Sequence, residues 1–406
     1  VFGITMDVSE GARSVSVGAD QPGSANHIDR WHELNGANAY DAFYKEFIDI
    51  DTTLYLTSNV PDSVYEQRLR MIFSPIGLPY NHIVKSYIET YTQKRQGLME
   101  KVIGRAEYYF PIIEPALDRH GLPQEIKMLA IIESALSPTA VSRVGATGLW
   151  QFMYGTGKSY GLEVSSFVDQ RRDPIASTDA ACRFLKDLYS IYGDWTLALA
   201  AYNCGPGNVN KAIRRAGGDT KNFWEIYAYL PRETRGYIPS FIAATYAYTF
   251  HRHHDIRPEP SPLPLATDTV MICRPMHFKQ ICSTIDTPLE VVRGLNPQYK
   301  MDIVPAVNGK TYSLTLPASD ISKFIDREGD IMCKDTVYMA EYLKPSNMTP
   351  GKKEFSLDSY TYRVKSGDTL GSIAAKHNVK VSQIMNWNNI KNPNKLSIGQ
   401  KLEIYR

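Results

Sequence analysis

A proline-rich stretch, Arg257–Pro264, divides this chain of 406 residues: four of its eight residues are proline. Proline fixes φ and has no backbone N–H to donate, so the stretch predicts a stiff, extended connection. Before it, from about Asp62 to His254, apolar residues recur at helical spacing, whereas the periodicity beyond it is mixed. Because a chain of this length exceeds one compact core, the sequence predicts a helical domain followed by smaller units.

The helical region contains two well-marked helices. In Ser177–Gly193 the apolar residues return at helical spacing, with Ser177 or Thr178 as the expected N-cap and Gly193 as the stop. The segment Tyr87–Phe110 has the same pattern. No segment of this region alternates with period two, so we expect an all-α domain.

Beyond the proline-rich stretch, two segments resemble each other at a constant offset of 92 residues: Ile272 matches Val364, Phe278 matches Leu370, Ile281 matches Ile373, Val292 matches Ile384 and Asn296 matches Asn388. Such spacing indicates two copies of one unit, each with a strand, two helices, an Asn turn and a closing strand, Tyr312–Leu316 or Lys401–Tyr405. The predicted fold class is α+β. The expected divisions are a poorly ordered or wrapping extension (1–60), the helical domain (61–256), a linker (257–267), the first unit (268–325), a second linker (326–359) and the second unit (360–406).

Composition narrows the function. Lys and Arg number 45 against 43 Asp and Glu, so no field of one sign attracts nucleic acid or anionic lipid. The 26 tyrosines suit either a sugar-stacking groove or a tyrosine-rich core. Five widely spaced cysteines argue against a disulfide framework and a zinc site, and no apolar run is long enough to span a membrane. Since the chain opens on Val1, we expect a mature or trimmed form that has lost an export signal.

Glu133 lies on the predicted helix Leu122–Leu136, which has Pro123 in its first turn. Apolar residues surround its position on both faces, so the helix is expected to be buried nearly all round. A carboxylate in such surroundings has a raised pKa, as a general acid for glycosidic bond cleavage requires. The alternative is a structural ion pair, for example with Arg143; the helix alone does not decide between them.

Three further motifs follow in order: Ser142–Met153 (SRVGATGLWQFM), Ala201–Gly207 (AYNCGPG) and Glu233–Tyr237 (ETRGY). With Glu133-Ser134 they resemble the lytic transglycosylases of the soluble-type, goose-lysozyme-like superfamily, and most closely the membrane-bound D group. The resemblance covers about Val64 to His254 and implies a lysozyme-like catalytic domain that cleaves peptidoglycan.

The resemblance implies a role for each matching residue. Glu133 would be the sole catalytic acid/base, and Tyr237 would lie over it. Substrate-binding positions would be Ser134, Ser142, Gln151, Tyr202 and Asn203. The sequence departs from the superfamily pattern at Trp150, commonly Met, and at Cys204, commonly Ala and expected to pack.

The implied reaction is non-hydrolytic cleavage of the bond between N-acetylmuramic acid (MurNAc) and N-acetylglucosamine (GlcNAc), leaving a 1,6-anhydro-MurNAc end. A muramidase on the same fold is the alternative and needs a second carboxylate. Asp169, Asp173 and Glu233 are the candidates, although capping and ion pairing are the ordinary roles of the first two. A non-catalytic wall-binding scaffold is the third reading.

The final unit, Tyr362–Tyr405, resembles a lysin motif (LysM), a βααβ fold that binds GlcNAc chains. The resemblance implies glycan binding by Gly367, Asp368, Thr369, Leu370 and Ile390, although Asp368 or Thr369 also suits a helix cap. The copy at Val270–Leu316 has Arg-Pro-Met-His where the Gly-Asp-Thr turn should be, so we expect a divergent LysM-like unit.

The remaining expectations concern partners and location. His251, His253, His254 and Asp255 suit a helix C-terminus better than a metal site, and Gly205-Pro206-Gly207 lacks the strand context of a nucleotide loop. We therefore expect no metal, cofactor, nucleotide or nucleic acid. Peptidoglycan glycan strands are the expected partner; other cell-wall enzymes are not readable from the sequence. The expected location is the periplasm or cell envelope; the sequence leaves association with the outer membrane open.

Overall fold

The computed structural model describes residues 60–219, 222–307, 309–334, 359–365, 367–377, 379, 381–388, 390, 392, 396–397 and 399–405. The expected N-terminal extension and most of the second linker lie outside these residues. Within them, no helix is both long enough and apolar enough to cross a membrane.

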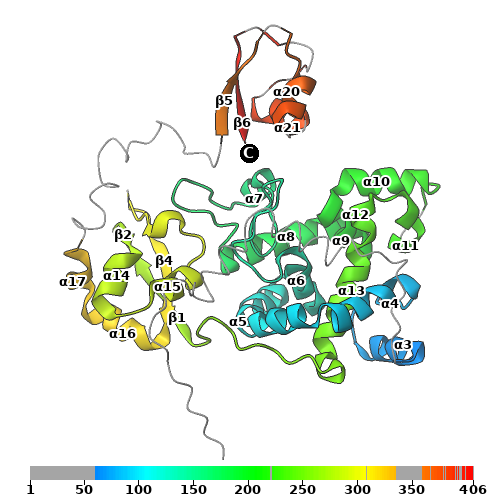
Figure 1. Ribbon diagram of the computed structural model, residues 1–406, viewed down its shortest axis with the longest axis horizontal. Helices are drawn as coiled ribbons and strands as arrows, with labels where there is room; N and C mark the ends of the chain where they lie inside the picture. The colour runs from blue at the N-terminus through cyan, green and yellow to red at the C-terminus, as the bar shows by residue number, and fades with distance from the viewer. Residues whose placement is uncertain are drawn as a thin grey trace, which may run out of the picture.

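The region before the proline-rich stretch is helical, as predicted (Figure 1). Helix α13 packs against α4, α6 and α9, and α8 packs against α5 and α9. The elements are α3 (Asp62–Met71), α4 (His82–Glu89), the π-helical turn η1 (Thr90–Lys94), α5 (Gln96–His120), the 3₁₀ turn η2 (Gln124–Lys127), α6 (Met128–Ser134), α7 (Tyr154–Ser159), α8 (Pro174–Tyr192), α9 (Trp195–Cys204), α10 (Pro206–Arg215), α11 (Phe223–Ile226), η3 (Tyr227–Tyr229), α12 (Arg232–Arg235), α13 (Tyr237–Thr249) and η4 (His251–His254). Among the described residues of this helical region, the strand-like pairings are isolated bridges, such as the one between Val141 and Thr147.

Two helix boundaries differ from the prediction. Helix α8 begins at Pro174, because the side chain of Asp173 accepts hydrogen bonds from the N–H groups of Ile175 and Ala176 and so caps the helix. The expected stop at Gly193 is confirmed, with φ of 63°. The segment expected as one helix, Tyr87–Phe110, is divided by η1, and its second part runs on to His120 as α5.

The first small unit pairs β1 (Thr267–Ile272) with β4 (Tyr312–Pro317), antiparallel. Between them lie β2 (Met276–His277), α14 (Phe278–Ile285), α15 (Leu289–Leu295), η5 (Lys300–Asp302) and β3 (Ile303–Val304). After β4 come α16 (Ala318–Asp326) and α17 (Glu328–Met332). Ile331 of α17 is fully buried in the core of this unit, so the linker expected from residue 326 begins later.

The second small unit has the predicted strand, two helices and strand: β5 (Ser359–Arg363), α20 (Leu370–His377), α21 (Val381–Trp387) and β6 (Lys401–Tyr405). The repeated asparagine plays the same part in both units. Asn296 donates its side-chain N–H to the carbonyl of Val292 at 2.8 Å, and Asn388 donates to that of Ile384 at 2.9 Å. These matching bonds support the repeat inferred from the sequence.

The proline-rich connection lies against α5. The N–H of Glu259 donates to the carbonyl of Glu100 at 3.0 Å, and Leu263 is buried in the helical core. Gly104 allows the approach, because a Cβ at this position would lie 1.8 Å from the carbonyl oxygen of Glu259. The connection is therefore packed along the helical domain rather than extended through solvent.

Candidate active site

Glu133 lies in the last turn of α6, and all seven residues of this helix are buried. The all-round burial follows the sequence prediction, but the helix is shorter than Leu122–Leu136. Its first part is the 3₁₀ turn η2, which begins after Pro123, and Ala135 and Leu136 have positive φ and end it. Glu133 therefore lies where the chain turns sharply, and the residue is 7% exposed.

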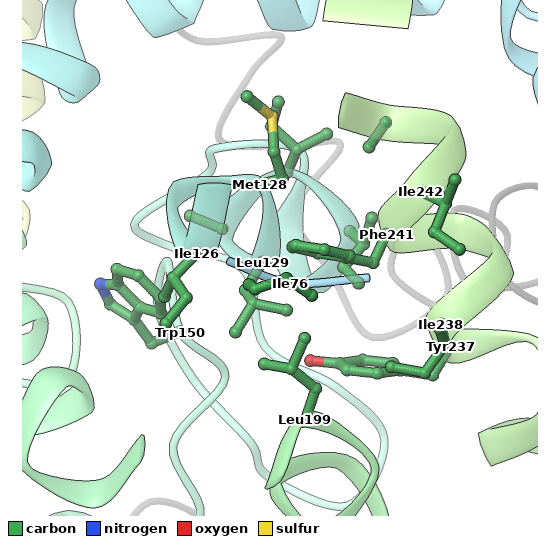
Figure 2. Packing of buried hydrophobic residues seen from close by; sticks show 14 of the residues in the cluster. Ile76, Ile126, Met128, Leu129, Trp150, Leu199, Tyr237, Ile238, Phe241 and Ile242 are labelled. Carbon is green, nitrogen blue, oxygen red and sulfur yellow. The ribbon is translucent and has the colours of Figure 1, made fainter. Parts of the chain in front are cut away.

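Tyr237, the first residue of α13, donates its hydroxyl to Oε1 of Glu133 at 2.6 Å. Figure 2 shows its ring among the buried side chains of this core, with the hydroxyl pointing away from α13 and beside Leu199. The alternative ion pair with Arg143 is not found: Glu133 makes no salt bridge to any described residue. The acid therefore faces a neutral partner.

Burial raises the pKa of Glu133 from its ordinary 4.5 to about 7, and the hydrogen bond from Tyr237 opposes the shift. The cause is desolvation, which disfavours the charged form. At neutral pH both forms are then populated, so one group is able to give a proton and take one back.

The segment 140–152 forms a tight loop beside α6. Gln151 has φ of 48°, and its side-chain amide donates to the carbonyls of Ala140 and Gly148, at 3.1 and 2.9 Å. Its Oε1 atom is buried and has no partner among the described residues. Ser142 accepts a hydrogen bond from the N–H of Ala146 at 3.0 Å. The fold of this loop thus depends on two of the expected substrate-binding residues.

Two other expected site residues hold this loop from outside. Ser134 donates to the carbonyl of Leu149 at 3.0 Å, and Tyr202 of α9 donates to that of Trp150 at 2.7 Å. Asn203 accepts from the hydroxyl of Thr234 at 2.9 Å. The structure thus brings Glu133 and Tyr237 into contact and connects α6 and α9 to the loop that carries Gln151.

Sequence reasoning missed two supporting residues. Trp150 is fully buried, and its indole N–H donates to the hydroxyl of Thr178 at 2.9 Å, so the indole belongs to the core. Thr234, which holds Asn203, stands inside the Glu233–Tyr237 motif but had no assigned role. The available signal was its position in the motif, where a hydroxyl side chain lies between the charged residues Glu233 and Arg235.

The three rival carboxylates have other environments. Asp169 is fully buried and forms a two-bond ion pair with Arg171. Asp173 caps α8, and Glu233 is exposed in the first turn of α12. Capping and ion pairing, the ordinary roles expected of the first two, are confirmed.

The expected glycan-binding residues of the last unit also shape its turn. Gly367 has φ of 86°, and Asp368 accepts hydrogen bonds from the N–H of Lys365 and the hydroxyl of Tyr362, at 2.7 and 2.8 Å. Thr369 accepts from the N–H of Ser372 at 3.1 Å, at the start of α20. Leu370 is buried, and Ile390 packs against the same small core.

His254 is engaged inside the protein. Its Nε2 accepts hydrogen bonds from Arg68 at 3.2 Å and Tyr246 at 3.0 Å. Burial, helped by the charge of Arg68, lowers its pKa to about 4, so the ring is neutral. No group of three or more His, Cys, Asp or Glu side chains suited to a metal ion is found in the described part of the chain.

Comparison with known families gives three matches along the chain. Residues 110–224 match the transglycosylase SLT domain, residues 266–332 match the LysM-like domain of lytic transglycosylase MltD, and residues 362–404 match the LysM domain. The middle match extends past 325, in agreement with the buried position of α17.

Individual relatives agree with these matches. The chain is 30% identical over 332 residues to the membrane-bound lytic murein transglycosylase D of Escherichia coli (strain K12), covering 81% of this chain and 70% of that protein. It is 33% identical over 137 residues to the soluble lytic murein transglycosylase of the same strain, covering 32% of this chain and 21% of the relative. The solved complex of the 70-kDa soluble lytic transglycosylase with bulgecin A aligns with a TM-score of 0.32 and 23% identity, over 42% of this chain and 26% of that one, which is too low to support an argument. The extended match, the SLT domain and the two LysM-type units show that the chain belongs to the membrane-bound lytic murein transglycosylase D family and is a lytic transglycosylase of peptidoglycan.

Proposed function

We propose that Glu133 is the single acid/base of a non-hydrolytic cleavage. Its protonated form gives its proton to the glycosidic oxygen between MurNAc and GlcNAc as the bond from C1 to that oxygen breaks. The resulting carboxylate then takes the proton of the MurNAc C6 hydroxyl while O6 bonds to C1. The products are a GlcNAc hydroxyl and a 1,6-anhydro-MurNAc end, and no water is consumed.

One observation carries this proposal: Glu133 is a buried carboxyl with a pKa of about 7 and a neutral partner. A group that acts first as acid and then as base works best when its pKa is near the working pH. Asp169 and Asp173 are already occupied by an ion pair and a helix cap. Neither is available as the second carboxylate that a muramidase requires.

The proposed groove continues from Glu133 along the loop 140–152. The unpartnered Oε1 of Gln151 is an acceptor suited to a sugar hydroxyl or amide. Ser142, Tyr202 and Asn203 are proposed to contact the glycan near the cleaved bond, and Ser134 to support the loop through its bond to Leu149.

The LysM unit is proposed to bind GlcNAc-containing strands through the turn Gly367–Leu370 and Ile390. The hydrogen bonds that Asp368 and Thr369 accept hold the shape of this turn. An enzyme with this substrate is proposed to be exported to the periplasm or cell envelope, and peptidoglycan strands are its proposed partner.

The test is Glu133→Gln, which keeps the shape of the side chain but has no proton to give. We expect loss of cleavage by about a thousandfold or more, with unchanged binding to insoluble peptidoglycan. A circular dichroism spectrum equal to that of the unmodified protein shows that the variant is folded. Activity equal to that of the unmodified protein would refute the role of Glu133.

The product test is separate. Mass spectrometry of digested sacculi should show anhydro-muropeptides from the unmodified protein. Reducing ends in their place would favour the muramidase. A non-catalytic scaffold would release neither.

A further inference from the structure

The chain between α7 and α8 connects the active-site loop to the LysM-like unit, and Arg171 is its contact with the loop (Figure 1). The guanidinium of Arg171 donates to the carbonyls of Gly145 and Phe152, at 3.0 and 3.3 Å. The backbone is equally close, because a Cβ at Gly148 would lie 1.8 Å from the carbonyl oxygen of Arg171. These contacts hold the middle and the C-terminal end of the loop 140–152, which contains Ser142 and Gln151.

Asp169 holds Arg171 in place. The two side chains form bonds of 2.9 Å (Nε to Oδ1) and 2.8 Å (Nη2 to Oδ2), and their exposed fractions are 0% and 4%. A buried two-bond pair between a guanidinium and a carboxylate has one geometry. Any displacement of Asp169 is therefore passed to the loop.

The other side of this segment is built into the LysM-like unit. The N–H of Asp169 donates to the carbonyl of Gln298, and the N–H of Lys300 donates to the carbonyl of Phe167, both at 2.8 Å. Val168 is 1% exposed and belongs to the core of that unit. A third contact joins the hydroxyl of Tyr312 to the carboxylate of Glu163 at 3.0 Å.

We propose that the LysM-like unit acts as a brace for the active site and that Arg171 is a positioning residue for the loop 140–152. The unit thus contributes to cleavage through the protein, whether or not it binds glycan. This inference rests on the proposed function, because the loop carries the proposed groove residues Ser142 and Gln151. A loop that is displaced by a fraction of an ångström lowers the rate of the chemical step more than it weakens binding of a long glycan strand.

Lys300 allows one bond of the brace to be removed alone. It is the first residue of η5, where proline is tolerated, and the preceding Tyr299 has the extended backbone (φ −87°, ψ 113°) that proline requires before it. Lys300→Pro removes both the side chain and the N–H that bonds to Phe167. Lys300→Ala, the matched control, removes the side chain and keeps the N–H.

In the chain of 406 residues we expect Lys300→Pro to lower kcat about tenfold relative to Lys300→Ala, with KM unchanged. Hydrogen exchange of amides in residues 142–152 should become faster in the proline variant only. Equal kcat in the two variants would overturn the proposal.

A second variant keeps the proposal testable if Lys300→Pro unfolds the small unit. Arg171→Lys retains the charge opposite Asp169 but lacks the planar fork that reaches Gly145 and Phe152. We expect a similar loss of kcat with unchanged KM; a kcat equal to that of the unmodified protein would overturn the brace. Cleavage is measured as the total soluble glycan released. This assay does not depend on whether the product has reducing ends or on whether Glu133→Gln stays active, so it tests the brace separately from the proposed function.

Discussion

Two of the buried carboxylates in the helical domain, Glu133 and Asp169, have surroundings that differ in one respect. Asp169 faces the guanidinium of Arg171 and is held by two hydrogen bonds. Glu133 faces only the neutral hydroxyl of Tyr237, and its pKa rises to about 7. The comparison teaches that burial alone does not mark a catalytic carboxylate. A charged partner keeps a buried carboxylate ionised in a structural ion pair, whereas a neutral partner leaves it able to exchange a proton.

The largest effect is expected on stability, when the ion-paired carboxylate Asp169 is replaced. Asp169→Asn leaves the buried Arg171 without a counter-charge and should lower the free energy of unfolding by about 3–5 kcal/mol, measured by urea denaturation. Asp173→Asn is the matched control, because asparagine caps a helix as well as aspartate does. Equal losses in the two variants would remove the distinction drawn for Asp169.

Glu133→Gln should act in the opposite direction on stability. The folded protein holds this proton up to a pH of about 7, whereas the unfolded chain releases it near 4.5. Between these values the folded state binds more protons, so the free energy of unfolding falls as the pH rises.

Glutamine cannot ionise, so it removes the free-energy cost of a buried, ionised carboxyl group. The variant should therefore be more stable than the unmodified protein by about 3 kcal/mol at pH 8. The difference should be much smaller at pH 5. Melting of both proteins at the two pH values checks this, and a gain independent of pH would contradict it.

Tyr237→Phe tests how the neutral partner sets the proton affinity. The hydroxyl stabilises the ionised carboxylate, so its removal should raise the pKa of Glu133 further. The high-pH limb of the kcat/KM profile should move upward by about one pH unit. Tyr246→Phe, on the same helix but bonded to His254, should leave the limb in place.

The smallest expected effect is at Glu233, the exposed carboxylate of the ETRGY motif. Glu233→Gln should leave kcat within about twofold, because a surface charge without a buried partner adds little to the active site. The assay is release of soluble glycan from sacculi. A loss as large as that of Glu133→Gln would give the domain a second functional carboxylate and favour a muramidase.

What the sequence predicted well depends on local pattern. The apolar residues around Glu133 predicted its burial, and the spacing of the repeat predicted that Asn296 and Asn388 occupy equivalent turns. The first feature follows from residues a few positions apart, where helix periodicity applies directly. The second follows from two segments that keep the same internal spacing at an offset of 92 residues.

What it did not predict depends on contacts between distant segments. The bonds that join Asp169 and Phe167 to Gln298 and Lys300 are made by backbone atoms, which carry no sequence signal. Trp150 stands in a substrate motif, yet its indole is fully buried and donates to Thr178, which lies 28 positions away in the sequence. The cap of α8 was readable from Asp173-Pro174, since proline is favoured directly after a cap, but the apolar pattern placed the start too late.

The packing of the proline-rich connection on Gly104 bears on how this protein can be rebuilt. In a free spacer an added residue costs little, because closure entropy grows slowly with length. Here one added residue would move Glu259 off Glu100 and Leu263 out of the core. Chimaeras between relatives should therefore exchange α5, the connection and the LysM-like unit as a single block. A junction placed inside Arg257–Pro264 would separate segments that pack against each other.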